Sequence, residues 1–372
     1  MSPTEEWPSS PAEPHDYIFK RQGRRQDAFS VDHPRVDDFV STFQSQWRGF
    51  FQRALARSGK YLPRMAAIME KEGVPPELAY LPLIESGFRP EAVSRAGAVG
   101  PWQLIRGTGR RYGLRIDQYV DERRDPVKST RAAARYLRDL YAMFGNWELS
   151  LAAYNTGEAR IARILERHQV DDFWDMMEQG YLHRETRDFV PQFLAALQIA
   201  RAPEAHGFDE PDAEPVRYDL VRVARSLPLR TVAKLAGAPV EEVSGLNPQL
   251  VRGVTPPDRE GYRVRVPKGT GERFELAYSR MVQEARQYQP QRVLAPRPAG
   301  EPYRVRRGDT PFGIARRLGV PVKSLMAANG WKNPRRLQIG QVVRVPAMRA
   351  QAGAKDASVR VAASKARKGR AN

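Results

Sequence analysis

One acidic residue lies in a segment that is otherwise almost entirely apolar. After Pro75 the sequence reads Pro-Glu-Leu-Ala-Tyr-Leu-Pro-Leu-Ile-Glu-Ser-Gly, and the second of these glutamates is Glu85. Two prolines at the start and a glycine at the end are typical of a short helix. Because apolar residues cover every face of this helix, we expect it to be buried on all sides. Burial and the negative end of the helix dipole should both raise the pKa of Glu85.

A carboxylic acid that keeps its proton near neutral pH can protonate a leaving group. This is the role of the general acid in the cleavage of a glycosidic bond. The alternative is a structural glutamate that is bonded to backbone amides or paired with an arginine. The segment around Glu85 does not by itself decide between the two interpretations.

Residues that could contact a sugar follow in two short stretches. Gly100 lies in a glycine-rich turn that leaves room for a close backbone approach, and Trp102 and Gln103 come directly after it. An aromatic face stacks on sugar rings, and an amide side chain bonds hydroxyl and N-acetyl groups. Tyr154 and Asn155, at the expected end of a helix, could hold a substrate or orient the acid. The alternatives are an ordinary loop and an ordinary capped helix end.

Two further carboxylates, Asp121 and Asp125, could be taken for a second catalytic acid. They stand on either side of Arg123 and Arg124, directly before a segment with helical periodicity. We favour the interpretation that they neutralise these arginines and anchor the helix start, with Ser129 as the N-cap.

Composition limits the classes of protein and of site. At 372 residues, 41% of them hydrophobic, the chain is long enough for two or three domains. No run approaches the roughly 20 apolar residues of a membrane span, and no signal peptide is visible at the start. Cysteine is absent, which excludes disulfides, thiolate metal sites and a cysteine nucleophile. His168 and His183 lack the spacing of a metal site, so we expect neither a metal nor a cofactor.

The net charge is strongly positive, at +18. Such a charge suits polyanionic surroundings, including nucleic acid, anionic lipid and anionic cell-wall polymers. The last 26 residues contain seven Lys or Arg and one Asp without an apolar period, so we expect a disordered basic tail there. Charge is the only feature that suggests nucleic acid, and we do not expect nucleic-acid binding.

Two segments in the second half of the chain repeat each other. Residues 232–247 align with residues 314–329, and each copy is followed by a strand-like Val-Arg-Val-Pro that ends at Pro267 or Pro346. A repeated order of helix, turn, helix and strand predicts two copies of one small module.

Four motifs in the first half resemble the catalytic domain of the soluble-lytic-transglycosylase family, closest to its membrane-bound type D group. The resemblance covers roughly residues 36–203. The motifs stand here as Glu85-Ser86, Gly97-Ala98-Val99-Gly100-Pro101-Trp102-Gln103-Leu104, Ala153-Tyr154-Asn155-Thr156-Gly157 and Glu185-Thr186-Arg187-Asp188-Phe189-Val190-Pro191. One departure is Phe189, where the family usually has tyrosine. The family's lipid-anchor cysteine is also not visible in this sequence.

The resemblance implies a lysozyme-like fold and a peptidoglycan substrate, cut between N-acetylmuramic acid and N-acetylglucosamine. It gives Glu85 the roles of general acid and then base, with 1,6-anhydro-muramyl ends as the product and no second catalytic carboxylate. By the same resemblance, sugar and acid would be positioned by Ser86, Gly100, Trp102, Gln103, Tyr154, Asn155 and Glu185. A periplasmic location in the cell envelope, a monomeric state and glycan strands as the partner are also implied.

Residues 303–346 resemble a LysM domain, a small βααβ fold that binds glycans containing N-acetylglucosamine. Gly308, Asp309, Thr310 and Asn329 are the residues that the resemblance assigns to glycan binding. In the first copy Ser226-Leu227-Pro228 replaces the Gly-Asp-Thr turn, so this copy is a degenerate module that is either structural or glycan-binding.

The sequence therefore predicts a mainly α protein with an all-α catalytic domain and small α+β modules. The predicted parts are an extended polar arm (1–35), the catalytic domain (36–203), a linker (204–216), the degenerate LysM-like module (217–269), a second linker (270–302), the LysM domain (303–346) and the tail (347–372). Two rival functions are a goose-type muramidase, in which water attacks the sugar, and a non-catalytic wall-binding protein.

Overall fold

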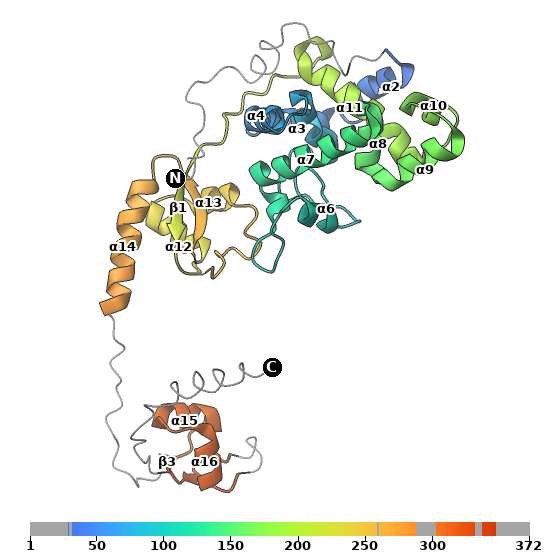
Figure 1. Ribbon diagram of the computed structural model, residues 1–372. Helices are drawn as coiled ribbons and strands as arrows, with labels where there is room; N and C mark the ends of the chain where they lie inside the picture. Colours follow the sequence, from blue (N-terminus) through green and yellow to red (C-terminus); the bar gives the residue numbers. More distant parts are fainter. Residues whose placement is uncertain (1–28, 30–31, 259, 288–302, 332–336, 347–372) are drawn as a thin grey trace, which may run out of the picture. The chain divides into compact units, whose positions relative to one another are not determined.

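The computed structural model describes residues 29, 32–258, 260–287, 303–331 and 337–346 (Figure 1). The described chain forms two compact units, Met1–Glu284 and Ala285–Asn372, which are treated separately below. Most of the predicted arm, the latter part of the second predicted linker and the whole predicted tail lie outside the described residues.

The first part of the Met1–Glu284 unit is built from helices, as predicted. Its elements are α2 (Pro34–Gln44), α3 (Arg48–Ser58), α4 (Leu62–Lys71), η1 (Pro76–Tyr80), α5 (Pro82–Glu85), α6 (Arg106–Arg111), η2 (Glu122–Arg124), α7 (Pro126–Phe144), α8 (Trp147–Thr156), α9 (Glu158–His168), α10 (Phe173–Glu178), α11 (Arg184–Arg201) and η3 (Glu204–His206). Within the described ranges, every helix is too short or too polar to cross a lipid bilayer.

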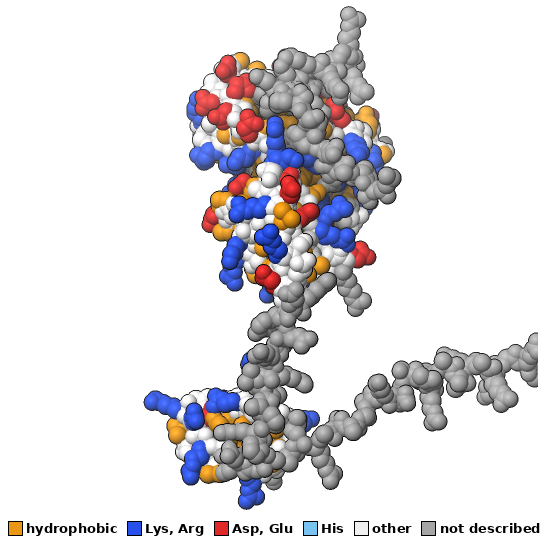
Figure 2. All heavy atoms as spheres, turned by 90° about the vertical axis from the view of Figure 1, so that its left-hand side faces the viewer, with side chains coloured by type: hydrophobic (Ala, Val, Ile, Leu, Met, Phe, Trp, Pro, Cys, Tyr) orange, Lys and Arg blue, Asp and Glu red, His pale blue; other side chains and the backbone are white. Residues whose placement is uncertain are grey.

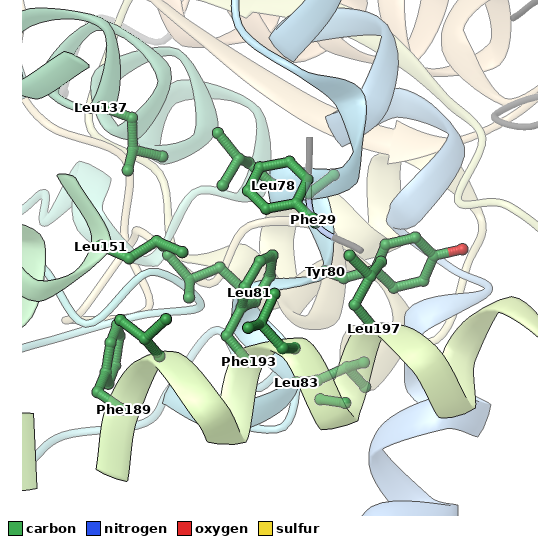
Figure 3. Packing of buried hydrophobic residues seen from close by; sticks show 14 of the residues in the cluster. Phe29, Leu78, Tyr80, Leu81, Leu83, Leu137, Leu151, Phe189, Phe193 and Leu197 are labelled. Carbon is green, nitrogen blue, oxygen red and sulfur yellow. The ribbon is translucent and has the colours of Figure 1, made fainter. Parts of the chain in front are cut away.

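The segment that carries Glu85 lies in the middle of the helical core. It forms a 3₁₀ turn, η1, followed at once by the single helical turn α5, and both pack against α11. The side chains of Leu78, Leu81 and Leu83 have no exposed surface, and Figure 3 shows them beside Phe193 of α11. The prediction of a helical segment buried on all sides is therefore confirmed.

Described residues of two segments that we predicted as an arm and a linker pack onto the helical core. Phe29 is 5% exposed and its ring lies 5.6 Å from that of Phe193, while His33 caps α2 and stacks on Trp174. Beyond α11, Phe208 is buried against Phe51. Both predictions were wrong at these positions, because single aromatic residues in polar segments pack onto the core without giving a periodic pattern.

The rest of this unit is the first copy of the repeat. Strand β1 (Tyr218–Val223) pairs antiparallel with β2 (Tyr262–Pro267), and α12 (Leu229–Ala236) and α13 (Val240–Leu246) lie between them in the chain. The predicted linker over 270–302 is wrong for its first half, which forms helix α14 (Gly271–Gln287). Phe274 is fully buried in the module core, and Tyr278 and Met281 pack against the same core at helical spacing.

The Ala285–Asn372 unit holds the second copy. It contains β3 (Tyr303–Arg304), α15 (Pro311–Leu318), α16 (Val322–Ala328) and β4 (Val342–Val343), with β3 antiparallel to β4. One asparagine plays the same part in both copies. Asn247 Nδ2 donates to Arg265 O (2.7 Å) and Asn329 Nδ2 donates to Arg344 O (2.7 Å), each joining the second helix to the last strand. The repeat prediction is confirmed.

Candidate active site

A cleft of about 1110 Å³ opens in the helical part of the Met1–Glu284 unit, and Glu85 lies in its wall. Its lining comes from helices α2, α5, α6, α7, α8, α9 and α11 and from the loop between α5 and α6. Residues of this lining that matter below are Arg35, Asp38, Glu85, Ala98, Gln103, Leu104, Tyr136, Tyr154, Asn155, Glu158, Glu185, Asp188 and Phe189.

The surroundings of Glu85 disfavour its charged form. Burial and, to a smaller extent, the negative charge of Glu185 together raise the pKa of the Glu85 carboxyl to about 8. The side chain is only partly exposed, so the carboxyl reaches the cleft while most of its surroundings are protein. At neutral pH it is therefore a protonated acid that a ligand in the cleft can reach.

The chain around Glu85 is held by contacts that are not local. Directly after the acid, Ser86 Oγ donates to Pro101 O (2.8 Å), which ties α5 to the loop before α6. Arg57 Nε donates to Gly87 O (2.6 Å) from α3. Phe88, fully buried, has a φ of 57°, a left-handed conformation that non-glycine residues adopt only where packing enforces it.

Gln103 and Tyr154 line the cleft from two different elements, and their contact with a substrate stays a prediction. Gln103 has a φ of 44°, and its Nε2 donates to Gly100 O (2.8 Å). Tyr154, in the last turn of α8, donates its hydroxyl to Trp102 O (2.6 Å). Burial raises the pKa of Tyr154 well above its usual value, so the phenol stays neutral. Gln103 Nε2 also donates to Ala92 O (3.5 Å), so the carbonyl oxygen of this amide is the group that can accept a hydrogen bond from a sugar.

Asn155 and Glu185 also line the cleft, one from α8 and one from the first turn of α11. Asn155 Oδ1 accepts a hydrogen bond from Thr186 Oγ1 (2.9 Å), which joins the two helices beside the acid. Phe189, one turn further along α11, contributes an apolar surface to the same wall. Contact of Asn155 and Glu185 with the substrate stays a prediction.

Three residues that we assigned to substrate binding do not line the cleft. Trp102 is fully buried, and its Nε1 donates to Thr130 Oγ1 (2.8 Å) in α7, so it cannot stack on a sugar. Gly100, with a φ of 85°, lies against Arg123, where a Cβ atom would approach Arg123 O to 1.9 Å. Ser86 is 4% exposed. These three residues therefore support the residues that line the cleft and do not line it themselves.

The two aspartates before α7 have the structural roles that we favoured. Asp121 pairs with Arg123 (2.7 Å), and Asp125 accepts from the backbone N–H groups of Val127 and Lys128. Asp125, not Ser129, is therefore the N-cap, because α7 begins at Pro126, one turn earlier than the apolar periodicity suggested. Asp125 also pairs with Arg265 at 2.8 Å. This arginine belongs to the first repeat, and the sequence did not predict the pair.

Several cleft residues were missed from the sequence. Arg35 pairs with Asp188 (2.8 Å), and Tyr136 donates its hydroxyl to Glu158 (3.2 Å). Asp188 stands within the family motif at residues 185–191, so it could have been assigned to the site. Arg35, in a polar and proline-rich stretch, has no local signal.

In the second repeat the predicted glycan-binding residues have roles within the fold. Asp309 accepts from the Tyr303 hydroxyl (2.7 Å) and pairs with Arg317 (3.2 Å), and Thr310 Oγ1 caps α15. Gly308, with a φ of 86°, forms the turn before them. Direct contact with a glycan stays a prediction for these residues and for Asn329.

Comparison with known families and proteins agrees with this arrangement. Residues 64–177 match the family "Transglycosylase SLT domain", residues 217–283 match "Lytic transglycosylase MltD, LysM-like domain" and residues 303–346 match "LysM domain".

Two relatives show how far the likeness extends. "Membrane-bound lytic murein transglycosylase D" of Escherichia coli is 35% identical over 308 residues, which are 81% of this chain and 66% of that protein. "Membrane-bound lytic murein transglycosylase F" of Alcanivorax borkumensis is 34% identical over 114 residues, covering 27% of this chain and 23% of that protein. The chain thus spans just under two thirds of the length of the type D relative.

Among solved structures, an inactive mutant of the lytic transglycosylase Slt from Pseudomonas aeruginosa is 25% identical, with a TM-score of 0.33, over 40% of this chain and 24% of that one. With an acid in a cleft, a matching catalytic domain, two matching LysM-type modules and this identity to a type D relative, the chain belongs to the family of lytic murein transglycosylases.

Proposed function

We propose that this chain is a peptidoglycan lytic transglycosylase that cleaves the β-1,4 bond between N-acetylmuramic acid and N-acetylglucosamine and leaves 1,6-anhydro-muramyl ends. The observation that carries the proposal is the cleft carboxyl of Glu85, whose pKa burial raises to about 8. The family match over residues 64–177 supports the substrate class.

In the first step Glu85 donates its proton to the glycosidic oxygen. The bond from C1 of the muramyl residue to that oxygen breaks, and the departing N-acetylglucosamine keeps the proton as a hydroxyl. The acid is then a carboxylate in surroundings that disfavour its charge, so it is poised to take a proton back.

In the second step the C6 hydroxyl of the same muramyl residue attacks C1, and Glu85 removes its proton. The C6–O–C1 bridge closes and the acid returns to its protonated form. One carboxyl serves both steps, whereas the usual glycosidases need two. Of the other cleft acids, Asp188 pairs with Arg35 and Glu158 with Arg111 (3.1 Å), so both already have cationic partners.

The polar groups around Glu85 position the sugar substrate. Gln103 presents an amide to sugar hydroxyl or N-acetyl groups, and Tyr154 can accept a hydrogen bond at the oxygen that donates to Trp102. Asn155 and Glu185 extend this polar wall along α8 and α11.

We further propose that the 303–346 domain holds the enzyme on the wall in the periplasm. Its described residues include seven Lys or Arg and a single acid, Asp309, and Figure 2 shows basic side chains over the visible face of this domain. Phe312 and Ile339 are 66% and 70% exposed, so apolar surface for a sugar face is available beside the charge.

The test is digestion of purified sacculi with the wild-type chain and with Glu85→Gln, followed by mass spectrometry of the products and a sacculus pull-down. We expect anhydro-muramyl ends from the wild type, no products from the variant and equal pull-down of both. Undiminished activity of Glu85→Gln would remove this residue from its role.

Hydrolysis by a muramidase is the second candidate, because Glu185 lies in the same cleft and its charge acts on Glu85. A second carboxylate could activate water on the other face of the sugar. Only reducing ends from the wild type, together with loss of turnover in Glu185→Gln, would favour this candidate over ours.

A further inference from the structure

The first repeat docks onto the segment that precedes α7. Val120 forms an antiparallel bridge with Leu250, and both side chains belong to the core of the module. On either side of this pair, Asp121 N donates to Gln249 O (2.9 Å) and Val251 N donates to Tyr119 O (3.2 Å). The module thus extends its own structure with a stretch of the catalytic part.

Two ion pairs also join the first repeat to the segment before α7 and to the N-terminus of that helix. Arg265 of β2 pairs with Asp125 at 2.8 Å, and the two side chains are 9% and 1% exposed. Arg115 pairs with Asp258 at 2.6 Å and is more exposed. The Asp125 carboxylate has a second role, because it also caps the N-terminus of α7. The buried pair with Arg265 therefore fixes one position for the docked repeat.

The second repeat has an arginine at the position that corresponds to Arg265. Val-Arg-Val-Pro ends both copies, so Arg344 is the counterpart of Arg265. Arg344 is exposed, whereas Arg265 is 8% exposed and ion-paired with the catalytic part. In the first copy this arginine is therefore buried in the contact with the segment before α7, whereas in the second copy it lies on the surface of its own module.

From the docked segment, a chain of polar contacts leads to the cleft wall. The carboxylate of Asp121 binds both Nε (2.9 Å) and Nη2 (2.7 Å) of Arg123, and Nη1 of that arginine donates to Gly97 O and Leu104 O, each at 3.0 Å. Arg123 is 4% exposed, and its own carbonyl lies against Gly100. The guanidinium thus clamps both ends of the 97–104 loop.

This loop carries the groups that face the substrate site. Ala98, Gln103 and Leu104 line the cleft, Pro101 O accepts from the serine next to Glu85, and Trp102 O accepts from the Tyr154 hydroxyl. A shift of the loop would move the polar wall relative to the acid, and small misplacements of this kind lower the rate of the chemical step.

We propose that the first LysM-like module is a brace for the catalytic cleft, which means that it holds the 97–104 loop of the cleft wall in position. Arg265 is the positioning residue through which it does so. The effect on turnover rests on the proposed function, but the effect on the loop does not. The module acts through the docked segment and Arg123, because none of its described residues belongs to the lining of the cleft.

The experiment compares Arg265→Met, Arg265→Lys and the control Lys268→Met in the full chain. Lys268 stands three residues further on and pairs with Asp219 within the module, at 3.0 Å and 68% exposure. We expect Arg265→Met to increase amide hydrogen exchange in 97–104 and to lower kcat/KM on sacculi on the order of tenfold. Arg265→Lys should keep most of the hydrogen-exchange protection of the loop and most of kcat/KM, and Lys268→Met should change neither quantity.

A disulfide provides the rescue. The chain has no cysteine, so a new pair of cysteines can form only one cross-link. The backbone hydrogen bonds on either side make Val120 and Leu250 a non-hydrogen-bonded antiparallel pair, in which the two Cα atoms approach most closely. Val120→Cys combined with Leu250→Cys can therefore form a disulfide. In the Arg265→Met background, oxidation should restore loop protection and turnover, and reduction should remove both.

The brace is refuted if Arg265→Met loosens only residues 218–267 while the loop and kcat/KM stay as in the wild type. If Arg265→Met does not fold, Arg115→Gln, which removes the more exposed pair with Asp258, applies the same test with a smaller expected effect. A wild-type chain with no activity would defeat the proposed function, while the exchange data would still decide on the brace.

Discussion

Replacing Glu85 with glutamine should stabilise the folded protein at neutral and alkaline pH while it abolishes turnover. In the unfolded chain this carboxyl ionises near 4.5, whereas burial in the cleft wall raises its pKa to about 8. Between these values the folded state binds more protons than the unfolded state, so the free energy of unfolding falls as the pH rises. Glutamine keeps the shape of the protonated acid and cannot ionise.

The size of the effect follows from the two pKa values. At about 1.36 kcal/mol for each pKa unit, a rise from 4.5 to about 8 sets a ceiling of about 5 kcal/mol above pH 8. Part of the Glu85 side chain meets solvent, so we expect roughly half of this ceiling, about 2 kcal/mol, at pH 8.5 and almost nothing at pH 4.

Urea unfolding followed by tryptophan fluorescence, at a series of pH values from 4 to 9, measures this difference. Glu70→Gln, at an exposed position of α4, controls for the loss of one negative charge. A stability gain for Glu85→Gln that is the same at every pH, or a variant less stable than the wild type at pH 8.5, would refute the reasoning.

Three further substitutions test the roles within the fold that the structure gives to residues predicted to bind a ligand. Trp102→Phe removes the hydrogen bond to Thr130 and should lower the free energy of unfolding by about 2 kcal/mol, while calorimetry shows unchanged affinity for glycan fragments; a loss of affinity alone would contradict its burial. Gly100→Ala forces a Cβ atom onto Arg123 O and should destabilise the domain by about 3 kcal/mol or more in urea unfolding; a neutral result would mean that the loop is not clamped. Asn329→Ala should lower the melting temperature of the second repeat and its sacculus pull-down but leave cleavage of soluble glycan chains intact; an unchanged melting temperature would dismiss its role in joining α16 to β4.

Much of the helical core and the acid itself could be predicted from local sequence. A run of apolar residues broken by Glu85 indicates burial and a raised pKa without knowledge of any distant contact. The helix stop at Gly145, with a φ of 65°, and the repeated Asn247 and Asn329 likewise follow from short patterns.

Side-chain direction within the glycine-rich loop could not be predicted. Trp102 and Gln103 are neighbours, yet one enters the core and the other lines the cleft. An irregular loop has no period that assigns its residues to faces, and the partner of the tryptophan, Thr130, lies 28 positions away. A large aromatic residue beside a binding motif was therefore misassigned to the substrate.

Contacts between distant segments were also beyond the sequence. Arg265 and Asp125 are 140 positions apart, and neither has a local pattern that names the other. Helix α14 is different, because Phe274, Tyr278 and Met281 do follow helical spacing and could have been recognised. The abundance of polar residues around them concealed it.

The account depends on an acid that stays protonated at neutral pH. Carboxyl titration by ¹³C NMR of the full chain labelled at glutamate, with Glu85→Gln used to assign the resonance, measures this directly. We predict a midpoint near 8 for Glu85, with the rate of sacculus cleavage falling through the same pH range. A midpoint near 4.5 would contradict the account.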